Sequence, residues 1–370
     1  MPEEIVLFPE PPDPPRVQFL RSIQQASDVE PSRSGLDTLL FGEDPAESRR
    51  LVRPFGCTVH DGVVYVTDTR LALILRIDIK GRELRAIAPK GRAKLRKPMN
   101  LCFAPDGTLY VADAGRRQVV VLTPEFGYAN AFGPFDGRSK PLDVIVHGQR
   151  LYVVDSGSFC VRVLDRGSGK QLLKFGDDEE NANEFMRGPT GIAVDKNGYA
   201  YVSDTIYGRV YVWDRDGNFV RHIGSDGAGD SVGDFFRPKG LAVADNTLYV
   251  LDSAFENCQV LSLNGDPLMF FGGPGIGPGR LYMPATIWIG TEGLELFRDQ
   301  LADDFEAERL ILIISQFGPR KLSFYAFGRS RNFEYPETKL PDVPDRQQLE
   351  APAKAEKARI VVEAEAEKEK

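Results

Sequence analysis

The chain has 370 residues, of which 42% are hydrophobic and 27% charged, with a formal net charge of −8 and a pI near 5.2. This is the composition of a globular protein, and no stretch approaches the 18 or more uninterrupted apolar residues of a membrane span. The acidic balance argues against a general DNA or RNA binder that is held mainly by phosphate contacts.

The first fifteen residues include six prolines, so we expect residues 1–15 to form an extended, semi-rigid linker. This segment lacks the apolar core of a signal peptide. Two locations therefore stay open. One is the cytoplasm, and the other is the cell envelope (periplasm or surface), if an export signal or a lipid anchor has been removed.

A repeat with the pattern Tyr-Val-x-Asp organises most of the chain that follows. It occurs five times at intervals of 42 to 49 residues, and its aspartates are Asp68, Asp113, Asp155, Asp204 and Asp252. In each copy a proline precedes a short apolar strand, and the Tyr-Val strand and two further strands follow. The clearest copy, residues 188–224, has the turn sequences KNG and RDG between apolar runs, which is hairpin chemistry. Each unit therefore predicts a four-stranded antiparallel meander.

Such a sheet is apolar on both faces, and several sheets around a common axis bury each face against a neighbour. A sixth, degenerate copy begins at residues 283–290 and continues in residues 308–328, with Ser315 where the other copies carry Asp. It lacks a fourth strand, which residues 16–23 (RVQFLRSI) would supply from the start of the chain. We therefore predict an all-β, six-bladed β-propeller of four-stranded antiparallel blades over residues 16–330, with the ring closed by the N-terminal strand.

Two segments depart from the repeat. In residues 291–308, apolar side chains recur at three- and four-residue steps: Leu294, Phe297, Leu301 and Phe305. This pattern predicts a short amphipathic helix that packs on the propeller or, alternatively, docks a partner. Residues 331–370 are polar and poor in core-forming side chains, so we expect a disordered tail.

The fourth repeat resembles the NHL repeat, the unit of a family of six-bladed propellers. The matching pieces are PTGIAVD from residue 189, YVSDT from residue 201 and RVYVWDRDG from residue 209. The resemblance extends over about residues 16–330 and implies the propeller fold. Relatives in this family include lyases, lactonase-like hydrolases, RNA-binding modules and protein-interaction modules, so the shared fold does not choose among functions.

More narrowly, the segments PPDPPRVQFLRSI and SQFGPRKLSFYAFG look like those of a group of bacterial six-bladed propellers. Members of that group are often exported or lipid-anchored and encoded beside multihaem cytochromes. The resemblance implies a protein partner, with a multihaem cytochrome as the specific expectation, and a place in the cell envelope.

The repeat aspartates invite comparison with a ring of metal-binding carboxylates. However, an Asp at a strand end followed by Thr, Ala or Ser accepts hydrogen bonds from the backbone amides of the adjoining connection. We therefore predict a structural role for these five residues and no metal site. The four cysteines (Cys57, Cys102, Cys160 and Cys258) lie far apart without a CxxC pair, so we expect buried thiols, with a Cys57–Cys102 disulfide as the alternative.

Enzymatic sites find little support in the sequence. His60, His147 and His222 are too dispersed to hold zinc as the amidating-lyase relatives do. A calcium-dependent lactonase needs oxygen ligands at the starts of the inner strands. Only Asn100 and Asp143 qualify there, and the corresponding positions elsewhere are Gly56, Gly191 and Gly240. We predict no catalytic residue and no cofactor, with a hydrolase or lyase site at the tunnel mouth as the alternative.

The functional prediction depends on the charged residues in the loops. In this topology, the links between blades and the turns after Tyr-Val-x-Asp share one face of the propeller. Basic residues gather there on blades one to three and acidic residues between blades three and four: Arg70, Lys90, Arg92, Lys94, Arg96, Lys97, Arg116 and Arg117 against Asp177, Asp178, Glu179 and Glu180. The next link adds Asp226, Asp230 and Asp234, and we group Lys80, Arg82 and Arg85 with the basic set.

Segregated charge steers association and fixes the orientation of a partner. We therefore predict a non-enzymatic scaffold that docks another protein through this face and has no DNA partner. An RNA-binding surface around residues 80–97 is a further alternative. It is weakened by the overall acidity and by the lack of aromatic residues interleaved with the basic ones.

Overall fold

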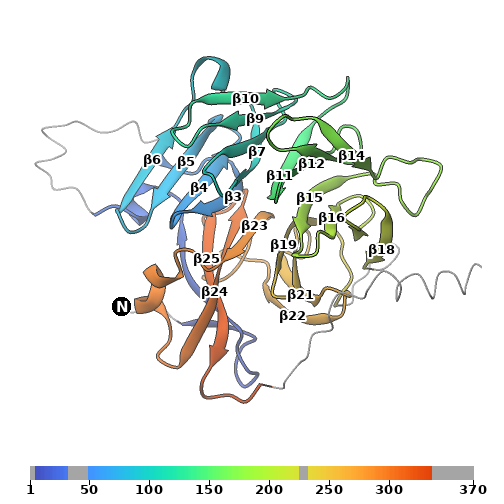
Figure 1. The fold of residues 1–370 in the computed structure, drawn as a ribbon. Coiled ribbons are helices and arrows are strands. Elements are labelled where there is room, and N and C mark those ends of the chain that lie inside the picture. The colour runs from blue at the N-terminus through green and yellow to red at the C-terminus, as the bar shows by residue number, and fades with distance from the viewer. Residues whose placement is uncertain (1–4, 32–48, 225–231, 336–370) are drawn as a thin grey trace, which may run out of the picture.

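Six antiparallel sheets surround a common axis in the computed structural model, which describes residues 5–31, 49–224 and 232–335 (Figure 1). Each sheet contributes one inner strand: β3 (Pro54–His60), β7 (Pro98–Phe103), β11 (Pro141–His147), β15 (Pro189–Val194), β19 (Pro238–Ala244) and β23 (Pro284–Gly290). Successive inner strands contact one another, and β23 contacts β3, so the ring is complete. The predicted all-β, six-bladed propeller is confirmed.

The outer strands follow the meander that the repeat predicts. Blade one continues with β4 (Val63–Asp68), β5 (Leu73–Asp78) and β6 (Glu83–Ile87), and blade two with β8 (Leu109–Asp113), β9 (Gln118–Leu122) and β10 (Tyr128–Phe132). Blade three has β12 (Arg150–Asp155), β13 (Cys160–Asp165) and β14 (Gln171–Phe175), and blade four β16 (Ala200–Asp204), β17 (Arg209–Trp213) and β18 (Phe219–Ile223). Blade five has β20 (Thr247–Asp252), β21 (Asn257–Ser262) and β22 (Pro267–Gly272).

Blade six joins the two ends of the propeller domain. Its sheet has the order β1-β2-β25-β24-β23, with β24 (Phe305–Ser315), β25 (Leu322–Ser330), β2 (Val17–Ile23) and β1 (Val6–Phe8). Strand β2 pairs with β25 from Val17 opposite Phe327 to Ile23 opposite Leu322. The N-terminal strand therefore closes the ring, as predicted.

Strand β1 was not predicted, because residues 1–15 were expected to be a linker. Val6 to Phe8 pair with the first half of β2, opposite Phe19 to Val17, and make a fifth strand in this blade. The physical reason is non-local: β2 lies at the outer edge of its sheet and offers unpaired backbone groups to the chain that precedes it.

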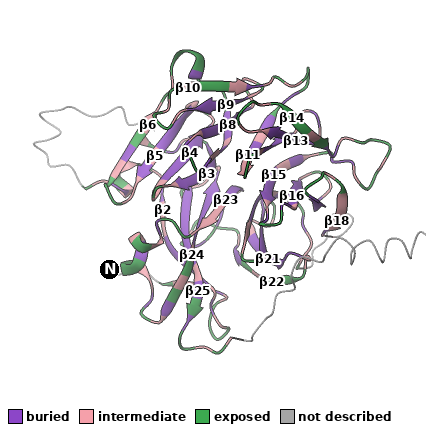
Figure 2. Cartoon of the chain, in the orientation of Figure 1, coloured by how far each residue is buried: buried purple, intermediate pink, exposed green. Residues whose placement is uncertain are grey.

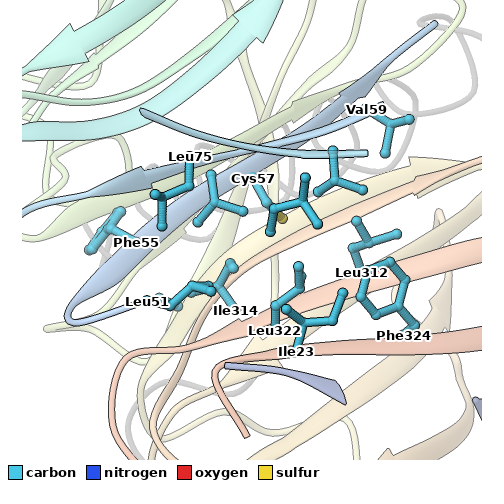
Figure 3. Close-up of a cluster of buried hydrophobic side chains, with 14 of the residues drawn as sticks. Ile23, Leu51, Phe55, Cys57, Val59, Leu75, Leu312, Ile314, Leu322 and Phe324 are labelled. Atoms are coloured by element: carbon cyan, nitrogen blue, oxygen red, sulfur yellow. The ribbon is translucent and has the colours of Figure 1, made fainter. Parts of the chain in front are cut away.

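The seam between blades six and one is a continuous apolar cluster (Figure 3). Ile23, Leu312, Ile314, Leu322 and Phe324 lie on the blade-six side, and all five side chains are fully buried. They face Phe55, Cys57, Val59 and Leu75 of blade one, with Leu51 between the two sheets. Since each fully buried aliphatic side chain stabilises the fold by about 1.5–3 kcal/mol, the seam makes closure a main source of stability.

Buried residues lie mainly on the second and third strands of each blade, such as β16 and β17, whereas outermost strands such as β10 and β14 are largely exposed (Figure 2). Because the strands of a blade run up and down, the turns alternate between two faces. We call the face with the interblade links and the second-to-third-strand turns the link face, and the opposite one the turn face. Lys80 and Arg82 follow β5, so they lie on the turn face and not with the basic set, as the sequence analysis had grouped them.

The insertion at residues 291–308 lies on the turn face and differs from the predicted helix. A 3-10 helix, η4 (Leu294–Gln300), replaces the longer amphipathic helix, and Phe305 already belongs to β24. The Gln18 side chain caps the end of this helix. Its Nε2 donates to the Gln300 carbonyl oxygen, and its Oε1 accepts a hydrogen bond from the Ala302 amide at 2.9 Å. Phe297 is buried with its ring 5.1 Å from that of Phe324, so the insertion packs on its own propeller.

Two further 3-10 helices, η1 (Ala26–Asp28) and η3 (Gly91–Ala93), lie in interblade links. None of the helices in the described part of the chain has the length and apolarity to cross a membrane. The predicted tail lies outside the described residues from residue 336 onward, as do Asp226 and Asp230.

Candidate functional site

The repeat aspartates are wholly buried, and their carboxylates are occupied by backbone amides. In blade one, Oδ2 of Asp68 accepts the amides of Val52 and Arg53, and Oδ1 accepts those of Arg70 and Leu71, all at 2.7–3.0 Å. Asp204 and Asp252 repeat this arrangement, and Asp113 accepts three amides. Each carboxylate therefore joins an interblade link to a turn. Among the described residues, no group of three or more His, Cys, Asp and Glu could hold a metal ion.

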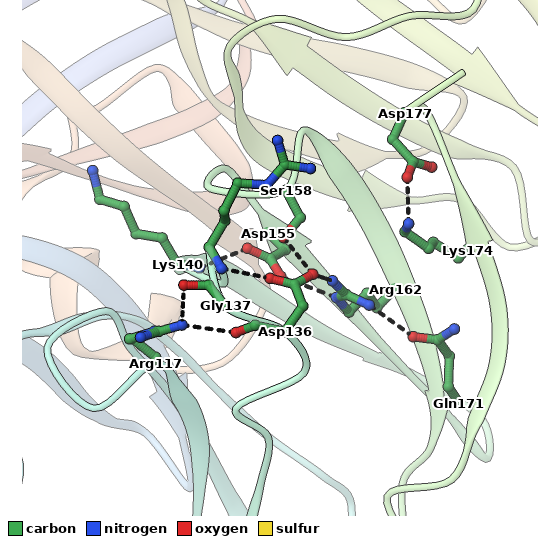
Figure 4. A network of polar contacts seen from close by, with 11 residues as sticks. Arg117, Asp136, Gly137, Lys140, Asp155, Ser158, Arg162, Gln171, Lys174 and Asp177 are labelled. Atoms are coloured by element: carbon green, nitrogen blue, oxygen red, sulfur yellow. Dashed lines mark hydrogen bonds and ion pairs between the residues drawn. The ribbon is translucent and has the colours of Figure 1, made fainter. Parts of the chain in front are cut away.

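Blade three replaces some of these amide bonds with an ionic network (Figure 4). Arg162 donates from Nε to Asp155, 2.9 Å away, and from Nη1 to Gln171 at 3.1 Å. It also pairs with Asp136 in the link that precedes the blade. Burial raises the pKa of the Asp136 carboxyl, but hydrogen bonds from Ser158 and from backbone amides, together with the Arg162 charge, lower it to about 2. The network holds the link between blades two and three in place.

The predicted basic residues all lie on the link face, but they have different roles. Arg116 donates to the carbonyl oxygens of Arg92 and Lys94, and Arg117 donates to those of Asp136 and Gly137. The guanidinium of Arg92 lies over the Tyr128 ring, 4.4 Å from its centre. The remaining five are exposed and form no ion pair with any described residue: Arg70, Lys90, Lys94, Arg96 and Lys97. We call these five the basic patch.

The acidic residues lie in the link between blades three and four, which is on the same face. Asp178, Glu179 and Glu180 are exposed, whereas Asp177 forms an ion pair with Lys174 of β14 (Figure 4). The structure thus places basic and acidic groups on different blades of one face. Most members of each group are neighbours in the chain, and no ion pair joins the two groups among the described residues.

A cavity of about 220 Å³ lies along the propeller axis, among side chains of the inner strands. The third residue of each inner strand lies at the same level: Gly56, Asn100, Asp143, Gly191, Gly240 and Thr286. Glycine is needed at three of these places because neighbouring strands approach closely. A Cβ atom on Gly56 would lie 2.6 Å from the Asn100 Cα atom, and one on Gly191 would lie 2.2 Å from the Lys239 carbonyl oxygen.

Asn100 and Asp143 meet at this level, as their positions in the repeat suggested. The Asp143 carboxylate accepts hydrogen bonds from the Asn100 side chain, from its neighbour Val144 at 2.8 Å and from the Ile192 amide at 3.0 Å. Burial raises the pKa of the Asp143 carboxyl to about 6, although these bonds act to lower it. The pair therefore links blades two, three and four, and it can exchange a proton near neutral pH.

Other reactive groups near the axis are not activated. Cys57 and Cys102 both line the cavity as free thiols, so the alternative disulfide is not formed. Burial raises the pKa of the Cys102 thiol to about 12, and a thiol that stays protonated is a poor nucleophile. His60 stacks on Phe103 with ring centres 4.3 Å apart, whereas His222 lies in β18, far from the axis, with Nε2 2.8 Å from the Asn183 carbonyl oxygen, so these imidazoles do not converge.

A second cavity, of about 540 Å³, opens on the link face between blades four and five. Its lining includes Ile206, Tyr207, Phe236, Arg237 and Lys239. This pocket was not predicted from the sequence, because it arises where two blades meet and no single repeat contains it. One signal was available: Lys239 is the second residue of its inner strand, where the other blades carry Phe55, Met99, Leu142, Thr190 and Ala285.

Comparison with known proteins places this geometry among propellers. No protein-family model matches the chain. A curated relative, NHL repeat-containing protein 2 of Gallus gallus, is 25% identical over 321 residues, which cover 68% of this chain and 43% of the relative. Protein SUPPRESSOR OF QUENCHING 1, chloroplastic, of Arabidopsis thaliana is 24% identical and covers 60% of this chain and 26% of its own length. The chain is a six-bladed propeller similar in sequence to NHL repeat proteins. It spans less than half the length of these relatives.

Solved structures show the same fold. The virginiamycin B lyase of Staphylococcus aureus matches 76% of this chain and 97% of its own, with a TM-score of 0.52 and 12% identity. A protein of unknown function from Bacteroides thetaiotaomicron matches 84% of this chain and 75% of its own, with a TM-score of 0.56 and 16% identity. At such identities the likeness concerns the fold alone.

Proposed function

We propose that this NHL-like propeller is a non-enzymatic interaction module that binds a protein partner through its link face. The basic patch is the observation that supports this most. Five exposed cations gather on blades one and two without an acidic partner among the described residues. Such a patch attracts and orients an acidic protein surface, and its effect falls as salt screens the charges.

The link between blades one and two, which carries most of the basic patch, is fixed by buried side chains and by hydrogen bonds. Ala93 and Leu95 are buried, so the residues on either side of them project outward. Asp113 accepts the amides of Arg96 and Lys97 at 2.7 and 2.9 Å, and Arg116 holds two further carbonyl oxygens of the same link. A backbone that is already ordered loses little conformational entropy when a partner binds, which favours this link as a docking element.

The acidic link between blades three and four gives the face a second sign of charge. A partner with one acidic and one basic region would bind in a single orientation, because the reverse orientation places like charges together. The resemblance of the chain ends to propellers encoded beside multihaem cytochromes makes such a cytochrome the first partner to test.

A matched pair of charge-reversal variants tests the proposal. The link-face variant carries Lys90→Glu, Lys94→Glu and Lys97→Glu. The control carries Lys80→Glu, Arg82→Glu and Lys170→Glu, which are exposed residues on the turn face with the same change in charge. The immobilised full chain is exposed to a lysate of the source cells at low and high salt, and the retained proteins are identified by mass spectrometry.

We expect a partner that the unchanged chain and the control retain at low salt, and that the link-face variant and high salt release. A purified multihaem cytochrome is then titrated against the same three proteins. If the unchanged chain retains no protein at low salt, or if both variants retain it equally, the proposal is wrong.

An enzymatic site on the axis is the second candidate, and the Asp143 carboxyl is the observation that favours it. A carboxyl with a pKa of about 6 is suited to general acid–base catalysis near neutral pH. One solved structure of the virginiamycin B lyase carries a histidine-to-alanine change and is described as catalytically inactive. No histidine is among the residues that line the axial cavity here. Turnover of an aliphatic lactone by the unchanged chain, lost in Asp143→Asn, would favour this candidate over the interaction module.

A further inference from the structure

The pocket between blades four and five contains a lysine where the repeat places other side chains. Lys239 directly follows Pro238, the first residue of its inner strand. Four of the other five blades carry an apolar residue at this second position. Its side chain is half-buried and lines the pocket wall. An ammonium group in such a place is partly removed from water and is costly unless an anion compensates it.

No acidic side chain supplies that compensation within the described pocket lining. Asp252 is the nearby carboxylate, but it is buried and accepts the amides of Phe236, Arg237, Ala254 and Phe255 at 2.6–3.1 Å. Burial lowers the pKa of Lys239, and the positive charge of Arg237 lowers it further. Arg237 is itself exposed and forms no ion pair with any described residue. Among the described residues, these two cations thus stand together without an ion-pair partner, although the Asp252 charge acts to raise the pKa of Lys239.

The rest of the pocket is mainly apolar. Phe236 is 48% exposed and Ile206 is 66% exposed, and both side chains line this one pocket, where a ligand could cover them together. Tyr207 adds an aromatic wall, held in place by the Arg209 guanidinium 4.8 Å above its ring. The volume of about 540 Å³ lies in the range of small-molecule sites, which is about 300–1,000 Å³.

We propose that this pocket binds a small organic carboxylate with an apolar or aromatic body. The carboxylate lies between the Lys239 ammonium and the Arg237 guanidinium, and the body contacts Ile206, Tyr207 and Phe236. This arrangement compensates both cations and covers the exposed apolar side chains in one step. The proposal concerns a different part of the link face from the basic patch and does not depend on the proposed function.

Calorimetry with 4-phenylbutyrate as the probe and 4-phenylbutan-1-ol as its uncharged counterpart tests this. We expect saturable one-to-one binding of the acid to the full chain, and binding of the alcohol that is weaker by about tenfold or more, because a charge-assisted hydrogen bond is lost. Lys239→Met and Arg237→Gln should each weaken binding of the acid by a similar factor. Phe236→Ser, on an exposed side chain, should weaken both compounds.

Lys97→Gln serves as the control, since it removes one cation from the basic patch and leaves the pocket intact. Thermal unfolding of every variant shows that the fold is retained, and Arg237→Gln changes an exposed side chain in case Lys239→Met does not fold. The proposal is overturned if the acid does not bind, if the alcohol binds equally well, or if Lys97→Gln weakens binding as much as Arg237→Gln does.

Discussion

The carboxylate of Asp143 in blade three accepts the backbone amide of Ile192 in blade four, 3.0 Å away. This bond crosses from one inner strand to the next at a level where neighbouring inner strands approach closely. Together with the Asn100 side chain, it makes one buried carboxyl a junction of three blades. The protonation state of Asp143 therefore affects the stability of the ring.

Asp143→Asn should change how stability depends on pH. Burial raises the folded-state pKa of this carboxyl from 3.8 to about 6, so the folded chain binds a proton that the unfolded chain has lost between these values. Stability from this group is therefore present below about pH 4 and falls as pH rises through 6, by about 3 kcal/mol. Urea unfolding at several pH values checks this: relative to the wild type, Asp143→Asn should gain stability as pH rises. A difference between the two proteins that stays constant with pH would contradict the prediction.

Arg162→Met should be strongly destabilising. The change leaves the fully buried Asp155 without its charged donor, and an unpaired buried charge costs about 3–5 kcal/mol. Arg329→Met is the control, because Arg329 pairs with Glu308, both side chains are about half exposed, and such surface pairs contribute about 0–1 kcal/mol. Chemical denaturation of both variants measures the two losses, and equal losses would show that the Arg162 network does not hold blade three.

Asp204→Ala should destabilise blade four by about 3 kcal/mol, because four backbone amides lose their acceptor. Asp216→Ala, in the turn between β17 and β18, is the control and should have a small effect. Hydrogen exchange at the amides of Arg187, Gly188, Ile206 and Tyr207 adds a local measurement. Slow exchange at these amides in Asp204→Ala would mean that the carboxylate is not their acceptor.

The fold could be predicted from the sequence because its signals are local and repeated. Turn sequences such as KNG and RDG, the recurring Tyr-Val-x-Asp and the proline before each inner strand mark the same positions in five copies. Even the closing strand could be identified, since the sixth copy lacks one strand and residues 16–23 match it. The site positions of Asn100 and Asp143 followed from the same register.

Features that depend on contacts between distant segments could not be predicted. Strand β1 forms because β2 has an open edge, which the composition of a proline-rich segment does not reveal. The Gln18 side chain ends η4 from the other end of the chain. The pocket at Lys239 is built by two blades together, and only comparison of that position across all six inner strands indicates it.

Strand β2 closes the ring beside β25, and this pairing decides which loops share a face. Ser22 lies opposite Ser323 in this register, while Ser330 lies seven residues further along β25. The double variant Ser22→Cys with Ser323→Cys should form a disulfide on mild oxidation, detected by mass spectrometry of proteolytic fragments. Ser22→Cys with Ser330→Cys should not. Absence of the first cross-link, or equal formation of both, would contradict closure by the N-terminal strand.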